Sequence, residues 1–177
     1  MLRLNKKGFT LVEYVIYIGV SAIVLTSLVT FTWGIINDQI YQQSQSTVDD
    51  AVNMVIDNVI YDIQKADNFD ITTQFDIDPG TLVLNMVDGS VITYEIFQQD
   101  VLIGGRLVSI NTLKKTLSTG EEYVLTADRV NVDDFILDDM SNDSVSTIRV
   151  TLTIKTINDK SQAYAAQQQV ITSATIR

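Results

Sequence analysis

A long apolar run near the N-terminus limits what this chain can fold into more than any other feature. The run extends from Phe9 to Ile36 and contains one charged residue, Glu13. A helix rises about 1.5 Å per residue, so a helix over this run would be about 42 Å long, whereas the hydrocarbon core of a bilayer is about 30 Å thick. The run therefore predicts a transmembrane helix over residues 9–36.

The charges on either side of the run predict its orientation. Arg3, Lys6 and Lys7 precede it, and Asp38 is the first charge after it. Because basic residues favour the cytoplasmic side of a transmembrane helix, we expect a cytoplasmic N-terminus and an extracytoplasmic remainder. A secretory signal has an apolar core of about 7–15 residues and a small-residue cleavage site, and this run does not fit that description. One interpretation is therefore an uncleaved signal anchor.

Glu13 does not suit a simple anchor. A carboxylate deep in a membrane-spanning helix costs about 2.5–3.5 kcal/mol on insertion scales, so such a residue suggests a function and a partner. The alternative is that Glu13, only five residues into the run, is hydrated near the membrane surface or is protonated.

The residues around Glu13 also carry a family resemblance. Residues 6–13 read Lys-Lys-Gly-Phe-Thr-Leu-Val-Glu and lead directly into the apolar run. This string resembles the cleavage and methylation motif of type IV prepilins and type II secretion pseudopilins. The motif consists of a basic residue, Gly, Phe, Thr, Leu, an apolar residue and Glu, followed by about twenty apolar residues.

The resemblance implies a role for each motif residue. Residues 1–8 would be a leader peptide, and a prepilin peptidase would recognise Lys7 and Gly8, cut before Phe9 and methylate the new amine of Phe9. Glu13 would pair with the N-terminal amine of a neighbouring subunit during filament assembly. Opposite charges attract strongly in hydrocarbon and an unpaired one is penalised, so this pair could set the register between subunits.

Two departures from major pilins narrow the resemblance. The apolar run lacks the Pro that many major pilins carry there, since the only Pro is Pro79, and the chain has no Cys for a C-terminal disulfide loop. Both departures favour a minor pilin or a pseudopilin. The order of elements expected below also resembles the J-type pseudopilins and the PilW-like minor pilins.

The helix is expected to continue beyond the membrane to about residue 66. No Pro or Gly interrupts residues 35–66, and the apolar residues after a polar bridge at 42–46 follow an amphipathic helical pattern. We expect the outer half, residues 37–66, to pack this stripe on a sheet. The stripe consists of Val48, Val52, Val55, Ile56, Val59, Ile60 and Ile63, and the polar residues expected on the other face are Asp49, Asp50, Asn53, Asp57, Asn58 and Asp62.

After Asp67 the apolar pattern alternates, which is typical of strands. A strand from Leu82 is expected to form a hairpin at Asp88-Gly89 with a strand around Tyr94. A turn at residues 98–100 and a bent strand over 101–108 are expected next. Further strands are expected at 122–125, 130–137, 148–155 and about 164–176. The predicted fold is α+β: a long N-terminal helix packed on an antiparallel sheet, with a β-rich head over residues 67–177.

Composition excludes several kinds of site. The chain has 177 residues, no His and no Cys, which removes His-dependent nucleophilic catalysis, His or Cys zinc sites and disulfides. Its net charge of -10 argues against nucleic-acid binding. The sequence contains one weak candidate for a metal site, a Ca²⁺-binding loop. The alternative is that the same acidic residues form a surface in contact with solvent. Its ligands would come from Asp133, Asp134, Asp138, Asp139 and Asp143.

The sequence thus predicts a non-enzymatic filament subunit with no cofactor. Its expected partners are other pilin or pseudopilin subunits through the N-terminal helix, prepilin peptidase, an inner-membrane assembly platform and the lipid bilayer. It would cross the bacterial inner membrane once and then enter a filament at the cell surface or in the periplasm. A type IV pilus, a type II secretion pseudopilus and a competence system fit equally well. The alternative is an uncleaved, signal-anchored extracytoplasmic binding domain that does not polymerise.

Overall fold

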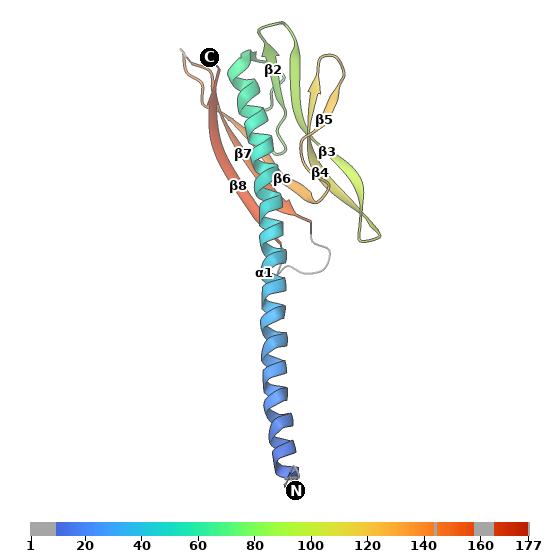
Figure 1. Ribbon diagram of the computed structural model, residues 1–177. Helices are drawn as coiled ribbons and strands as arrows, with labels where there is room; N and C mark the ends of the chain where they lie inside the picture. The colour runs from blue at the N-terminus through green and yellow to red at the C-terminus, as the bar shows by residue number, and fades with distance from the viewer. Residues whose placement is uncertain (1–9, 144, 158–164, 177) are drawn as a thin grey trace, which may run out of the picture. The chain divides into compact units, whose positions relative to one another are not determined.

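The computed structural model describes residues 10–143, 145–157 and 165–176. It contains one long helix followed by antiparallel strands (Figure 1), which confirms the predicted α+β class. The helix α1 is Leu11–Lys65, in agreement with the predicted helix. The strands are β1 (Ala66–Phe69), β2 (Leu82–Met86), β3 (Val91–Ile103), β4 (Arg106–Leu117), β5 (Glu122–Val124), β6 (Val130–Asp139), β7 (Thr147–Thr156) and β8 (Gln167–Thr175).

The chain divides into an N-terminal unit, Met1–Ile40, and a C-terminal unit, Tyr41–Arg177. The described part of the N-terminal unit is almost entirely the first half of α1. Every residue of this unit from Leu11 to Ile36 is exposed, although most are apolar. By length and composition, this helix could cross a membrane.

In the C-terminal unit, one face of α1 is buried. Val48, Val55, Val59 and Ile63 are fully buried and Val52 is nearly so. Their spacing places them on one helix face, as the sequence predicts, and together with residues of both sheets they form one hydrophobic core. Burial of this face ties the second half of α1 to the sheets.

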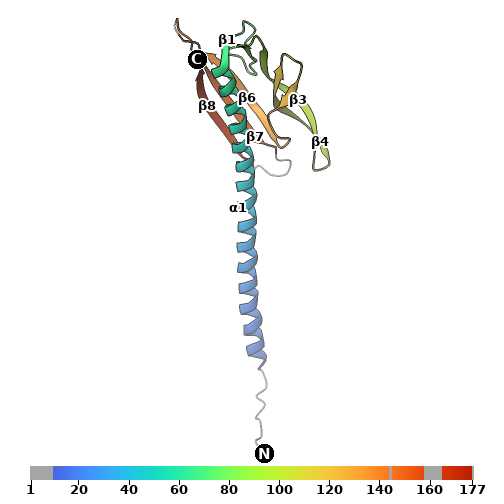
Figure 2. The same cartoon turned by 45° about the horizontal axis from the view of Figure 1, so that its top comes forward.

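The strands form two sheets, whereas one sheet was expected. The first has the order β1-β2-β3-β4-β5 and the second has the order β6-β7-β8, and every pairing within them is antiparallel. Figure 2 shows the same elements from a second direction. The alternation of apolar residues identifies strands but carries no information about which strands pair, so it could not distinguish one sheet from two.

The expected turn at residues 98–100 is wrong. The strand β3 continues through these residues, where Gln98 pairs with Asn111 and Gln99 pairs with Ile110. The chain reverses instead at Gly104 and Gly105, whose φ angles are 58° and 85°. Two-residue hairpin turns need positive φ, which glycine adopts readily and Gln does not. The Gly-Gly pair is therefore the hairpin turn and does not bend a longer strand.

The remaining strand predictions hold with shifted ends. The turn at Asp88-Gly89 is confirmed, with Gly89 at a φ of 81°. The strand β8 begins at Gln167, whereas the expected start at Tyr164 lies outside the described residues. Strand β1 and the part of β4 beyond residue 108 were not predicted.

Candidate functional site

The N-terminal motif is the main functional site that the sequence predicts, and the structure describes only its last part. Lys7, Gly8 and Phe9 lie outside the described residues, which begin at Thr10. Glu13 is in the first turn of α1. The geometry of this site is therefore that of Glu13 and its surroundings.

Thr10 and Glu13 form a reciprocal pair of hydrogen bonds at the start of α1. The backbone N–H of Thr10 donates to Glu13 Oε2 at 3.0 Å, and the Thr10 hydroxyl donates to the same oxygen at 2.9 Å. The backbone N–H of Glu13 in turn donates to Thr10 Oγ1 at 3.3 Å. This arrangement is a capping box, in which a residue pair three positions apart satisfies free N–H groups at a helix N-terminus.

The capping box gives Glu13 a partner within its own chain. A carboxylate in the first turn also interacts favourably with the helix dipole. This capping role of Glu13 was not predicted, although its signal is present in the sequence as Thr-x-x-Glu directly before an apolar run. Glu13 is thus exposed and locally paired in the first turn of α1.

The helix surface that follows Glu13, over residues 14–36, is mostly apolar and carries no charged side chain. Serine and threonine hydroxyls within it bond back to the helix, as in the donation from Thr26 Oγ1 to the Ala22 carbonyl at 2.8 Å. Thr30 and Thr32 make the same kind of bond. These polar groups are satisfied internally, so this surface is chemically suited to contact lipid or other apolar helices.

The structure does not bring the five candidate Ca²⁺ ligands together. Among the described residues, no group of three or more acidic side chains is arranged to hold a metal ion. Asp133 forms an ion pair with Lys155 at 2.8 Å, Asp138 lies 3.9 Å from Arg149, and Asp139 accepts the Ser141 N–H at 2.9 Å. The other two candidate residues are Asp134, which lies in β6, and Asp143.

These aspartates are distributed along a strand because Asp133, Asp134, Asp138 and Asp139 all belong to β6, where successive side chains point to opposite faces. The strand β6 is an edge of the second sheet. The residues at 76–80 cover part of this edge, since the N–H groups of Asp76 and Gly80 donate to carbonyls of β6 at 2.8 and 2.7 Å. Residues 76–80 thus protect part of an edge strand from pairing with another chain.

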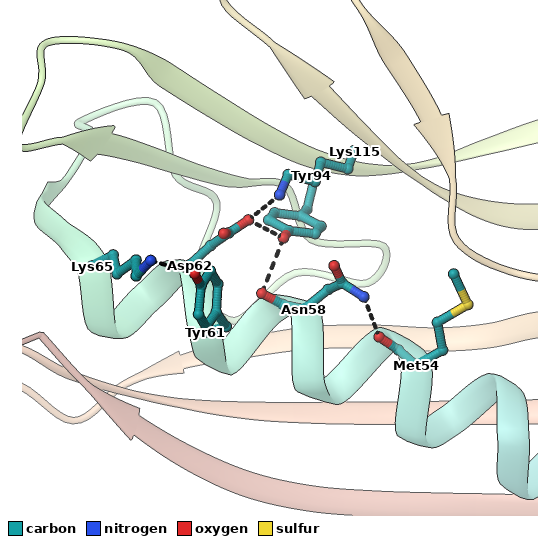
Figure 3. Close-up of polar contacts among 7 residues, drawn as sticks. All are labelled: Met54, Asn58, Tyr61, Asp62, Lys65, Tyr94 and Lys115. Atoms are coloured by element: carbon teal, nitrogen blue, oxygen red, sulfur yellow. Dashed lines mark hydrogen bonds and ion pairs between the residues drawn. The ribbon is translucent and has the colours of Figure 1, made fainter.

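A buried polar cluster in the C-terminal unit was not predicted. It consists of Asp62 from α1, Tyr94 from β3 and Lys115 from β4 (Figure 3). Lys115 Nζ lies 2.5 Å from Asp62 Oδ2, and the Tyr94 hydroxyl donates to the same carboxylate oxygen. The Tyr94 hydroxyl also lies 3.2 Å from the backbone carbonyl oxygen of Asn58.

The register of the first sheet explains how the cluster assembles. Tyr94 and Lys115 are direct partners across β3 and β4, so their side chains leave the sheet on the same face, toward α1. Asp62 is only 4% exposed, which corrects its predicted place on the solvent face of the helix. The basic pair Lys114-Lys115, which the sequence suggests as a surface loop, lies instead within β4.

The cluster is a structural contact with a fixed protonation pattern. Burial raises the pKa of Tyr94, and its hydrogen bond to Asp62 and the charge of Asp62 raise the pKa further. Tyr94 therefore stays protonated and acts as a donor. Beside it, Met54, Leu117, Tyr123 and three other residues together with Lys115 line an open, largely apolar groove of about 420 Å³.

Comparisons of the chain with models of protein families, with curated proteins and with solved structures find no match.

Proposed function

We propose that this protein is a minor pilin or pseudopilin, a structural subunit of a type IV pilus-like or type II secretion filament. The observation that carries the proposal is the motif at residues 6–13 at the start of a helix that continues unbroken to Lys65. The exposed apolar half of this helix could anchor the subunit before assembly and pack against other subunits afterwards.

In this proposal prepilin peptidase removes residues 1–8 and methylates Phe9. Thr10 then becomes the second residue of the mature chain and retains the groups that bond Glu13. The Glu13 carboxylate would have a partner in the free subunit, and a neighbour's N-terminal ammonium would join or replace it during assembly. The carboxylate would thus be hydrogen-bonded in the free subunit and its charge compensated in the filament, which matters because an unpaired charge in hydrocarbon is costly.

The proposed location is the bacterial inner membrane, with a cytoplasmic N-terminus and an extracytoplasmic C-terminal unit. Assembly would use an inner-membrane platform and energy from a cytoplasmic ATPase on another chain. Type IV pili, type II secretion pseudopili and competence pseudopili all contain such subunits, and the proposal covers these three. The protein's own role is mechanical, without catalysis.

The second candidate is an uncleaved, signal-anchored binding domain. The capping box favours it, because Thr10 satisfies Glu13 without any neighbouring chain. Under this alternative Glu13 only caps a helix, and its charge has no further role.

The variant Glu13→Gln separates the two candidates. Glutamine can still complete a capping box, so the helix start is kept while the charge is removed. As a subunit, the variant should be cleaved normally but lost from filaments sheared off the native cells, by about tenfold or more relative to the unaltered chain. The measurement is the fraction of the protein in the sheared filaments, quantified by mass spectrometry.

The matched control is Thr10→Val, which removes the side-chain part of the cap and leaves the charge of Glu13. A filament subunit should tolerate Thr10→Val better than Glu13→Gln, since a neighbour's amine can still pair with Glu13. The filament proposal is contradicted if Glu13→Gln is incorporated as well as the unaltered chain.

A further inference from the structure

The strand β8 forms an open edge of the second sheet. It pairs with β7 along its whole length, from Gln167 to Thr175, and no other described strand lies on its far side. Figures 1 and 2 show it as the outermost strand of this sheet. It has nine residues, none of which is charged, Pro or Gly, and its pairing with β7 contains no register shift. This edge is therefore long, regular and uncharged.

Two hydrogen bonds at the ends of β8 show which of its backbone groups point outward. The N–H of Thr156 donates to the Ala166 carbonyl at 2.8 Å, and the N–H of Ile176 donates to the Ser146 carbonyl at 3.0 Å. In an antiparallel pair, residues that bond the neighbouring strand alternate with residues whose groups point away from it. The even-numbered residues of β8 therefore bond β7, and the outward N–H and C=O groups have no hydrogen-bond partner among the described residues. These outward groups belong to Gln167, Gln169, Ile171, Ser173 and Thr175.

The other strand edges in the described part of the chain are protected against pairing. The strands β1 and β5 have only four and three residues and carry Asp67 and Glu122. The strand β6 carries four aspartates and is partly covered by residues 76–80. The strand β3 carries Glu95 where it extends beyond β2, and β4 carries Arg106 where it extends beyond β5. Charges, short lengths and covers are the usual means of blocking an edge, and β8 has none of them in the described residues.

The edge of β8 is also held in place before any partner arrives. Ala174 lies in the hydrophobic core and Val170 packs against it, so one face of the strand is fixed to the rest of the C-terminal unit. Ile171, on the other face, is 60% exposed. A partner would therefore meet an ordered edge, without the entropy cost of ordering it, and an exposed apolar side chain to pack against.

We propose that the free edge of β8 binds an extended segment of another protein, which adds a strand to the second sheet. Rows of N–H and C=O groups at strand spacing are complementary to another extended backbone, whereas a helix has already used its own backbone groups. The site therefore selects its partner by backbone conformation. This inference is independent of the proposed function, because it does not require filament assembly.

Charge limits the side chains of the partner. The whole chain has a net charge of -10, although β8 carries no charge. The field of the chain repels an acidic segment, and it repels a second copy of the chain for the same reason. We therefore expect the bound segment to be neutral or basic.

Hydrogen exchange of the full chain in detergent, measured by NMR, tests the proposal with a synthetic peptide. The probe is a capped peptide of alternating threonine and valine, N-methylated at alternate residues so that only one of its edges can pair. The matched control is the same peptide N-methylated at every residue. We expect the probe, and not the control, to slow exchange of the outward amides of Ile171 and Ser173 by about tenfold or more.

The variant Ser173→Pro shows whether the probe binds at this edge. It removes an outward N–H and no bond to β7, and an edge strand tolerates proline at such a position. Its matched control is Ser173→Ala, which keeps the N–H. The probe should bind Ser173→Pro about tenfold or more weakly and Ser173→Ala as well as it binds the unaltered chain. Equal binding to all three chains would overturn the proposal.

The exchange rates of the unaltered chain decide the matter even if Ser173→Pro fails to fold. No slowing of the outward amides at millimolar probe would overturn the proposal. Slow exchange of these amides without any probe would also overturn it, because the edge would then be occupied already. If that slow exchange grows with protein concentration, the occupant is a second copy of the chain.

Discussion

At the scale of single residues, Asp62 is a charged side chain buried in the C-terminal unit. Its two partners determine how much its burial lowers the stability of this unit. Its carboxylate is compensated by the ammonium of Lys115 and by the Tyr94 hydroxyl. Removing one partner of a buried ion pair leaves the other charge uncompensated, which costs more than the intact pair contributes. The three residues come from three elements, so the cluster also fixes how α1 sits on the first sheet.

We expect Lys115→Met to lower the free energy of unfolding by about 3–5 kcal/mol, because Asp62 would remain buried without its ammonium. The measurement is urea unfolding of the full chain in detergent, followed by circular dichroism. The matched control is Lys114→Met on the same strand. Its partners Glu95 and Glu122 are substantially exposed, so the loss should be about 1 kcal/mol or less. Equal losses for the two variants would show that the Asp62 cluster has no special role.

The sequence could not predict this cluster. A helical pattern assigns Asp62 to the polar face, and its partner Tyr94 is 32 positions away in the chain. Only the pairing of β3 with β4 brings Tyr94 and Lys115 to one place. The capping box is the opposite case, because Thr10 and Glu13 are three positions apart and their pattern is local.

At the scale of elements, the β3–β4 hairpin depends on its two glycines. Gly105 has a φ of 85°, and a Cβ added there would meet no atom within 4 Å apart from those of its chain neighbours. The requirement for glycine at this position is therefore one of backbone conformation and not of space.

Gly105→Val should destabilise the hairpin by about 1–2 kcal/mol, the usual cost of a left-handed conformation for a residue with a side chain. Gly105→Asn is the control, since asparagine tolerates this conformation better and should cost less. Hydrogen exchange of the amides of β3 and β4 measures the effect locally. A similar loss of protection for Val and Asn would contradict the conformational explanation.

Element types were easier to predict than element partners. The helix was predictable within two residues at either end, because an unbroken apolar run followed by an amphipathic stripe has one interpretation. The hairpin at Asp88-Gly89 was predictable for the same local reason. The second sheet and the long β4 depend on pairings between distant segments, which periodicity does not encode.

At the scale of the whole molecule, an exposed apolar helical segment is continuous with a C-terminal unit whose described residues form a hydrophobic core. The helix α1 belongs to both, so a subunit of this kind could be held in a membrane or a filament by one half while the other half stays folded. The fold class was predictable from the sequence. The proposed function rests on a motif whose expected cleavage residues lie outside the described part of the chain.

Intact-mass spectrometry of the protein purified from its native membrane shows whether the chain is processed as a prepilin. A filament subunit should begin at Phe9 and carry one methyl group on its N-terminal amine. A chain that still begins at Met1, in cells with an active prepilin peptidase, would contradict the proposed function and would favour the signal-anchored binding domain.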